Sequence, residues 1–336
     1  MRPKRATARP YIPMTYSVAI RTLGLDPQTL ERVLRGVFAQ TVRPEKVMVY
    51  IARGYRKPDF RVGSEEYVEV GKGMMRQRAL DYKEITSDCI LMLDDDLEMD
   101  PDVAGRLLKA ISEGYDLVGC DVFKNHKMSL TAKVKAAVTN LVRPHKRNYG
   151  FALTRSGSFL YPRHPEEGVC DSDTCAGNIM MWRRQSLLGL RLTDEIWLDS
   201  LGFAYGDDAL ISYKATANGL KVGVDFDAEV TNLDRRTSSD LYRRDPERYY
   251  IRAKAMTMTW WRMIYQPLGR NVKGNPIVHG CGLDKALWVS FLMIFQSIFS
   301  LSHRPFTATV RGIKDGAKEA ENGVLASLPP YIISNK

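Results

Sequence analysis

The first half of the chain alternates short apolar runs with segments in which apolar residues recur every three or four positions. The runs at 16–21, 46–51 and 89–93 have the length and composition of buried β-strands. After the first run, Asp26-Pro27 predicts a helix start, with Asp as N-cap and Pro at the first helical position. Alternation of strand and helix patterns predicts an α/β domain built on a parallel sheet.

Further elements continue this pattern as far as residue 224. We predict helices at 74–82, 101–112 and 207–218, and strands at 117–120, within 170–184 and at 221–224. From residue 241 the strand signals fade and the remaining sequence has helical patterns. We therefore divide the chain into a basic N-terminal segment at 1–14, an α/β domain at 15–240 and a helical region at 241–336.

Positive charge is concentrated in one part of the sequence. The 336 residues carry a formal net charge of +10, and residues 122–165 hold nine Lys and Arg side chains but no Asp or Glu. We treat residues 122–168 as a basic insert in the α/β domain. Within it, residues 129–141 place apolar side chains on one face of a predicted helix. A basic amphipathic helix is typical of proteins that bind an anionic membrane surface; a solvated helix packed on the domain is the alternative.

A second apolar run, at residues 286–301, suggests contact with a membrane. As a helix it would span about 24 Å, which is less than the ~30 Å hydrocarbon core of a bilayer. We expect this run to lie at the membrane interface; a buried helix at a core or homodimer contact and a true span are the alternatives. Residues 249–265 include Trp260, Trp261 and Arg262, which predict an interfacial belt beside it.

Composition narrows the class of protein. Hydrophobic residues make up 44% of the chain and charged residues 26%, which excludes a disordered protein. Five cysteines are too few for a disulfide scaffold. The N-terminal sequence MRPKRATARPYIPMTYS has no apolar core, so we expect no secretory signal and a cytoplasmic protein that is peripheral on the inner face of the cell membrane.

Acidic residues stand where an α/β sheet binds ligands. Asp94, Asp95 and Asp96 follow directly on the third predicted strand, and the carboxyl ends of parallel strands form the ligand-binding edge. Two carboxylates with water oxygens suit Mg²⁺ or Mn²⁺, which in turn can bind a diphosphate. Asp207 and Asp208 open a later predicted helix. Each group alone also fits an ordinary structure, either a solvated acidic loop or acids that favour a helix dipole. The two together on one α/β chain are more informative.

These motifs resemble those of a known family. The sequence is similar to glycosyltransferases of family 2, whose nucleotide-sugar-binding domain has the GT-A fold. The resemblance covers roughly residues 15–235 and rests on the segments YSVAIRTL, VFAQTVRPEKVMVYI, CILMLDDDLEMDPDV, AGNIMMWRR and AYGDDALISYKATANGLKV. It implies a GT-A-type mixed, mostly parallel sheet flanked by helices, to which the helical and membrane-associating C-terminal region is added.

The resemblance also implies roles for single residues. Asp94 and Asp96 match the pair that holds the metal on the diphosphate. Asp208 matches the general base, with Asp207 beside it. The residues placed at the nucleotide sugar are Arg21, Thr22, Arg76, Asp95, Gly177 and Asn178. Independently of the resemblance, we place three residues on the acceptor side: Asp194, Glu195 and Trp197.

The chain departs from the family pattern in three places. Residues 50–54 hold no acid where similar enzymes contact uracil, so the nucleotide base stays open. Asn232 stands near the position of a His that contacts the metal or the phosphate. Residues 260–262 do not match the Gln-x-x-Arg-Trp signature of processive synthases, which implies transfer of a single sugar.

Together these observations predict a metal-dependent, inverting glycosyltransferase. It would move one sugar from a nucleoside-diphosphate sugar to a hydroxyl of a lipid-linked or surface-glycan acceptor, with Asp208 as general base. A nucleotidyltransferase with the same metal site is the first alternative, although a glycine-rich phosphate loop is missing near the first strand. A non-catalytic protein that binds nucleic acid or a membrane, and a degenerate sugar-nucleotide binder, are the others. We expect no nucleic-acid partner, because the chain has no nucleic-acid motif.

Overall fold

The computed structural model describes residues 14–124, 147–153, 157, 159–162, 166–202, 205–233, 246–267 and 304–332. The predicted basic helix at 129–141 and the apolar run at 286–301 lie outside these residues.

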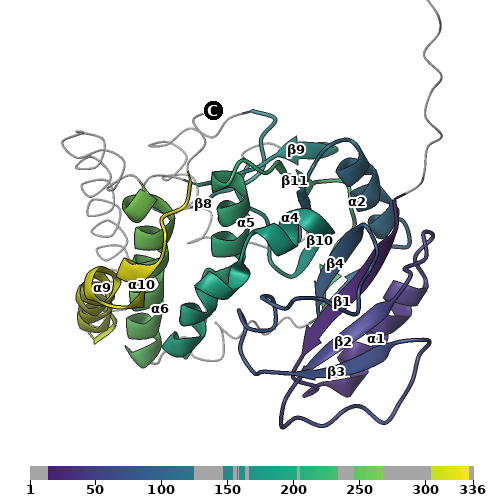
Figure 1. Cartoon of the computed structure of the whole chain (residues 1–336), viewed down its shortest axis with the longest axis horizontal. Helices are drawn as coiled ribbons and strands as arrows, with labels where there is room; N and C mark the ends of the chain where they lie inside the picture. The colour runs from purple at the N-terminus through teal and green to yellow at the C-terminus, as the bar shows by residue number, and fades with distance from the viewer. Residues whose placement is uncertain are drawn as a thin grey trace, which may run out of the picture.

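A mixed sheet of eight strands forms the centre of the α/β domain, in the order β3-β2-β1-β4-β10-β6-β11-β9 (Figure 1). Its strands are β1 (Tyr16–Thr22), β2 (Val47–Ala52), β3 (Glu66–Val70), β4 (Cys89–Asp94), β6 (Leu117–Cys120), β9 (Val169–Asp171), β10 (Ile179–Arg183) and β11 (Val222–Asp225). β10 runs antiparallel to both β4 and β6, and β9 runs antiparallel to β11. The other neighbours in this sheet pair in parallel. The predicted mixed, mostly parallel sheet is confirmed.

Two short pairs of strands flank the sheet. β5 (Leu97–Met99) pairs with β12 (Val230–Asn232), and β7 (Ala152–Leu153) pairs with β8 (Phe159–Leu160). In the first pair, Asn232 lies opposite Leu97, and the N–H of Leu233 donates to the carbonyl oxygen of Asp96 at 2.7 Å. Asn232 is thereby held next to the predicted metal-binding motif.

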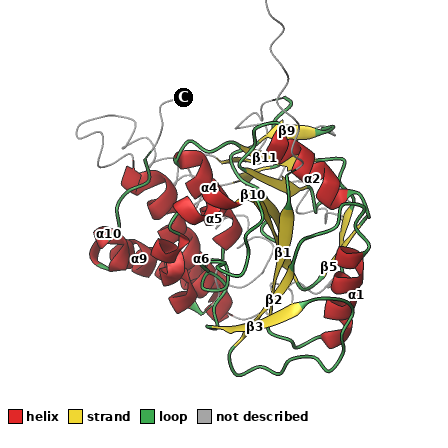
Figure 2. Ribbon diagram, turned by 45° about the vertical axis from the view of Figure 1, so that its right-hand side comes forward, coloured by secondary structure: helices red, strands yellow, loops and turns green. Residues whose placement is uncertain are grey.

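Helices cover both faces of the sheet (Figure 2). They do so because each buries an apolar side against the sheet. α1 (Pro27–Phe38) and α2 (Val103–Ser112) share a buried apolar cluster with one face of β1, β2 and β4. α4 (Arg184–Gly189), the 3₁₀ helix η1 (Leu192–Leu201) and α5 (Asp207–Ala217) pack on the other face. The Asp26 side chain accepts from the N–H of Thr29 at 3.1 Å, so the predicted N-cap is confirmed.

The helix that we predicted at 74–82 is a series of turns. Long-range hydrogen bonds fix the conformation of this segment. The Asp199 carboxylate accepts from the N–H groups of Met75 and Arg76 at 2.9 and 3.0 Å. The Gln77 side chain donates to the carbonyl oxygen of Thr22 at 3.2 Å, at the end of β1. The segment is thus fixed across the carboxyl ends of the strands.

Most of the described residues after β12 are helical. They form α6 (Pro246–Trp260), the π-helix η2 (Trp261–Tyr265), α9 (Arg304–Asn322) and α10 (Val324–Ser327). α6 and α9 pack closely. Gly316 permits this approach, since a Cβ atom at this position would lie 2.8 Å from the carbonyl oxygen of Lys254. Among the described helices, none has the length and apolar character needed to cross a membrane. Arg262 is only 1% exposed, so the interfacial belt that we predicted is wrong for this residue.

Candidate active site

The first acidic motif lies against the end of β1. The register of β1 and β4 places Arg21 beside Asp94, and Arg21 Nε donates to Asp94 Oδ1 at 2.6 Å. Thr22 Oγ1 donates to Asp95 Oδ2. Burial disfavours the Arg21 cation, but the charges of Asp94 and Asp207 outweigh it and raise the pKa of Arg21. The sheet edge thus holds a paired cation and carboxylate from two strands.

The second acidic motif reaches the same edge through α5. Asp207 and Asp208 occupy the first turn of this helix. The guanidinium of Arg78, only 3% exposed, lies between the two motifs: its Nε atom is 3.2 Å from Asp207 Oδ2, and its Nη2 atom is 4.0 Å from Asp94 Oδ1. The acids that are far apart in the sequence therefore converge around one buried arginine, as the sequence interpretation requires.

The start of β10 closes the space between the motifs. The carbonyl oxygen of Asn178 accepts from the N–H of Asp94 at 2.9 Å. A Cβ atom on Gly177 would lie 2.5 Å from the Cβ of Asp208 and 2.8 Å from Arg78 Nη2. Because no larger side chain fits at this position, Gly177 allows the base candidate and the arginine to approach β4. Both predicted residues therefore line the site.

The Asp208 carboxylate is buried, and its pKa is raised. Burial, and then the neighbouring charge of Asp207, raise its pKa to about 6, while the Ala209 N–H bond and the Arg78 charge oppose this shift. The N–H of Ala209 donates to Asp208 Oδ1 at 2.8 Å and fixes the carboxylate. A carboxylate with a pKa near 6 is ionised at neutral pH and is a stronger proton acceptor than an ordinary aspartate.

The donor set for a cation consists of oxygen atoms. In the part of the chain that the structure describes, no three His, Cys, Asp or Glu side chains form a metal cluster. Asp94 and Asp96 would need a further ligand, and Asn232 supplies a candidate. Its Oδ1 atom is buried and accepts no hydrogen bond, and β12 holds it beside the motif. Carboxylate and amide oxygens suit Mg²⁺ or Mn²⁺, so the residues present fit the predicted metal.

The acidic side chains identify this candidate site, whereas the volume of a cavity does not. A hollow of about 680 Å³ lies along β9, which stands four strands away from β4 in the sheet. Its lining includes Lys221, whose Nζ atom is 3.7 Å from Asp171 Oδ1. Neither acidic motif lines this hollow.

Comparison with known protein families finds one match within the α/β domain. Residues 27–163 match the family model described as Glycosyl transferase family 2. This part of the chain is therefore similar to family 2 glycosyltransferases. The match includes the Asp94–Asp96 motif and Arg78, whereas Asp207 and Asp208 follow it in the sequence. No curated protein sequence matches the chain.

Two solved glycosyltransferases resemble the chain distantly in structure. The first, described as "Crystal structure of GalNAc-T7 with UDP, GalNAc and Mn2+", is 15% identical, with a TM-score of 0.47 over 73% of this chain and 51% of that chain. This chain thus spans about half of that one. The second, "Mannosyltransferase PcManGT from Pyrobaculum calidifontis in complex with GDP-Man and Mn2+", is 14% identical, with a TM-score of 0.46 over 95% and 90% of the two chains.

Two nearby arginines of the α/β domain differ in their surroundings. Arg76, which we predicted at the nucleotide, is exposed, and a Cβ atom on Gly71 would lie 2.8 Å from its Cδ. Its role at the nucleotide stays a prediction. Arg78, which the sequence interpretation missed, is the cation between the carboxylates. The only sequence signal for this role is that Arg78 follows Arg76 by two residues.

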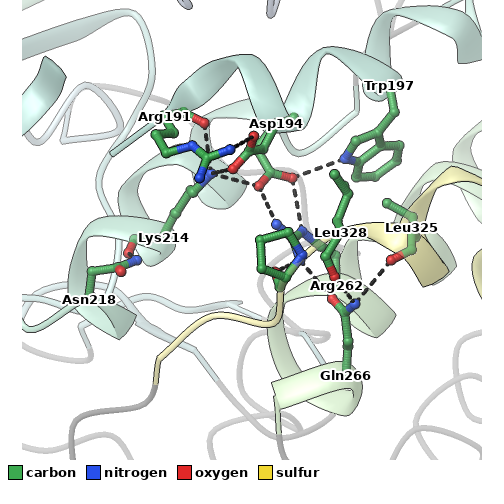
Figure 3. A network of polar contacts seen from close by, with 11 residues as sticks. Arg191, Asp194, Trp197, Lys214, Asn218, Arg262, Gln266, Leu325 and Leu328 are labelled. Atoms are coloured by element: carbon green, nitrogen blue, oxygen red, sulfur yellow. Dashed lines mark hydrogen bonds and ion pairs between the residues drawn. The ribbon is translucent and has the colours of Figure 1, made fainter. Parts of the chain in front are cut away.

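The residues that we predicted on the acceptor side belong to a buried polar network (Figure 3). Glu195 is fully buried, and its carboxylate accepts hydrogen bonds from Trp197 Nε1 at 3.0 Å, Lys214 Nζ at 2.9 Å and Arg262 Nη2 at 2.8 Å. Asp194 Oδ2 lies 3.6 Å from the same Lys214 Nζ. Glu195 and Trp197 therefore have a structural role in this geometry, because their polar atoms point into the network and are already bonded.

This network joins α5, the helix that carries Asp208, to the C-terminal region. Lys214 lies on α5, and Arg262 lies on η2. Arg262 Nη1 donates to Gln266 Oε1 and to the carbonyl oxygen of Pro329, both at 2.7 Å. Gln266 Nε2 then donates to the carbonyl oxygen of Leu328 at 2.9 Å. Figure 3 shows these contacts around Arg262 and Gln266.

Proposed function

We propose that the protein is a metal-dependent, inverting glycosyltransferase that moves a single sugar from a nucleoside-diphosphate sugar to a hydroxyl of an acceptor. The observation that carries this proposal is the convergence of Asp94 and the Asp207-Asp208 pair on Arg78 at the carboxyl edge of the sheet. Two separate acidic motifs around one buried arginine are an arrangement that can hold a diphosphate on one side and a base on the other.

Each residue in this arrangement has a chemical task. Asp94, Asp96 and Asn232 would hold Mg²⁺ or Mn²⁺, and the bound cation supplies positive charge for the leaving diphosphate. Asp208 accepts the proton from the acceptor hydroxyl as its oxygen attacks the anomeric carbon. Arg78 pairs with the Asp207 carboxylate. Its positive charge offsets the repulsion between Asp207 and Asp208. A single base with direct attack by the acceptor leads to inversion.

Charge and hydropathy support a proposal for the acceptor and for the place of action. We propose a lipid-linked or surface-glycan acceptor, and a protein that is peripheral on the inner face of the cell membrane. The basic insert at 122–168 would bind the anionic surface, and the apolar run at 286–301 would enter the interface. A homodimer contact at 286–301 is the competing proposal, which fractionation with membranes and its reversal by detergent would contradict.

Nucleotide sugars should stabilise the protein only when a divalent cation is present. Binding at 100 times the dissociation constant adds about 2.7 kcal/mol to the free energy of unfolding. Thermal unfolding with a panel of UDP, GDP and dTDP sugars, with Mn²⁺ or with excess chelator, measures this effect. Release of free nucleoside diphosphate during turnover distinguishes sugar transfer from nucleotidyl transfer.

A matched pair of variants tests the metal ligand. Asp96→Asn should remove the cation-dependent part of the stabilisation. Asp100→Asn, which changes an exposed acid four residues further on, should leave it unchanged. Equal stabilisation of the wild-type protein with and without chelator would contradict the assignment of Asp94 and Asp96.

Transfer should fail in mild acid. The pKa of Asp208, raised by burial and by Asp207 to about 6, marks the pH below which the carboxylate is protonated and cannot accept a proton. We expect kcat/KM to be constant above pH 7 and to fall as the pH drops through about 6. Steady-state rates from pH 5 to 8 measure this, with circular dichroism at each pH to confirm the fold. A flat profile across this range would exclude Asp208 as the base.

A further inference from the structure

Two exposed aromatic rings stand at the carboxyl end of β6. The side chains of Phe123 and Tyr161 are 50% and 37% exposed. Their ring centroids are 6.3 Å apart, and the ring planes meet at 83°. The pair therefore forms an apolar corner on the surface instead of filling the core.

Contacts with buried side chains fix the position of both rings. Asp121, which is 4% exposed, accepts the N–H of Phe123 on Oδ1 at 3.0 Å, and its Oδ2 accepts the hydroxyl of Tyr161. The buried ring of Phe151 lies 6.0 Å from that of Phe123 and 5.4 Å from that of Tyr161. One carboxylate and one buried ring thus fix the orientation of two exposed rings. A surface that is fixed in this way loses little conformational entropy when a ligand binds.

The pair lies on the same edge of the sheet as the catalytic acids. β6 and β4 are both antiparallel to β10, which stands between them, so both end at the same edge. Two strand spacings correspond to roughly 10 Å. The loop that leads into β10 spans this gap: Cys175 packs against Gly119 of β6, and Gly177 adjoins Asp208. The aromatic corner is therefore a neighbour of the proposed base.

We propose that Phe123 and Tyr161 form a platform on which a sugar ring of the acceptor stacks. This inference rests on the proposed function, since it names the class of acceptor that would present its hydroxyl to Asp208. The C–H face of a sugar is apolar and its rim carries hydroxyls, so it needs a small apolar surface with polar groups at the border.

The border of the platform has this character. Lys124 follows Phe123, and its Nζ atom lies 2.6 Å from Glu229 Oε1. Both side chains of this pair are nearly half exposed, at 43% and 47%. Their charged groups can bind hydroxyls at the rim of a ring. A lipid chain would instead need a continuous apolar groove, whereas here a charged residue follows directly on Phe123 and interacts with the charge of Asp121.

Saturation-transfer NMR with methyl glycosides of glucose, galactose, mannose and N-acetylglucosamine tests the platform on the full-length protein. We expect at least one glycoside to bind. Phe123→Ala and Tyr161→Ala should each weaken that binding about two- to tenfold, the range expected when an aromatic contact is lost. Leu188→Ala is the matched control, because Leu188 is also 37% exposed but lies on α4, which follows β10 at the opposite edge of the sheet.

The outcomes separate this inference from the proposed function. Asp96→Asn should lose cation-dependent stabilisation by nucleotide sugars but bind the glycoside as the wild-type protein does. If nucleotide sugars bind and glycoside affinity is the same in Phe123→Ala, Tyr161→Ala and Leu188→Ala, the platform is wrong and the proposed function stands. Absence of binding by every glycoside also overturns the platform. If no nucleotide sugar binds but Phe123→Ala still weakens the glycoside, the proposed function fails and the platform remains.

Discussion

Asp208→Asn should reduce the rate of sugar transfer by at least about 100-fold, because proton transfer by a positioned base contributes roughly 10²–10⁴ in rate. Asn has the shape of Asp and can keep the contact with the N–H of Ala209, so the first turn of α5 should stay intact. The amide cannot accept a proton from the acceptor hydroxyl. The measurement is kcat for transfer, together with the dissociation constant of the nucleotide sugar.

Asp208→Asn should lower kcat but leave the dissociation constant of the nucleotide sugar nearly unchanged. We expect the affinity for the nucleotide sugar to change little, because in our proposal Asp94 and Asp96 form the diphosphate side of the site. Asp102→Asn is the control: Asp102 precedes α2 as its N-cap residue and makes no side-chain capping bond. It should leave transfer unchanged. Near-normal kcat in Asp208→Asn, or equal losses in the two variants, would remove Asp208 from the role of base.

The acidic motifs could be predicted because their positions are local properties of the sequence. An apolar strand followed at once by Asp94 places a carboxylate at the ligand edge of a parallel sheet. Acids at the start of a predicted helix place Asp207 and Asp208 in its first turn. Which edge that helix approaches is a tertiary property, and only the resemblance to family 2 implied it.

The role of Arg78 could not be read from the sequence. Apolar periodicity predicted a helix at 74–82, which would have assigned its side chains to helix faces. Long-range hydrogen bonds hold the segment instead: Gln77 donates to Thr22, and the N–H groups of Met75 and Arg76 donate to Asp199. Tertiary contacts that outweigh local propensity are invisible to a pattern of spacings. The choice between two neighbouring arginines therefore needed the fold.

Glu195 misled the sequence interpretation for a similar reason. An acid next to a tryptophan in a polar segment is consistent with a sugar-binding surface. Its partners Lys214 and Arg262 are distant in the sequence, and nothing in either segment indicates that they pair. The carboxylate is nevertheless saturated, and its neighbouring cations hold the pKa of Glu195 below its usual range although burial alone would raise it.

This burial makes Glu195→Ala the substitution with the largest expected effect on stability. Lys214 and Arg262 are 4% and 1% exposed, and removal of the carboxylate would leave two cations without their main partner. Breaking a buried ion pair in this way typically costs about 3–5 kcal/mol. Urea unfolding should therefore show a loss of this size. Glu247→Ala breaks an exposed pair with Arg311 at 3.2 Å and should cost less than about 1 kcal/mol.

A compensated variant separates the loss of charge balance from the loss of packing. The combination Glu195→Met, Lys214→Met and Arg262→Met removes all three charges and keeps similar volume, so it should recover much of the stability, because apolar replacement of a whole buried ion network is often neutral or better. It would also break the bonds of Arg262 to Gln266 and Pro329, which fix the C-terminal segment. If Glu195→Ala unfolds at the same urea concentration as Glu247→Ala, the network does not stabilise the contact between α5 and the C-terminal region. If the triple variant is less stable than Glu195→Ala, the lost hydrogen bonds cost more stability than the unbalanced charge does.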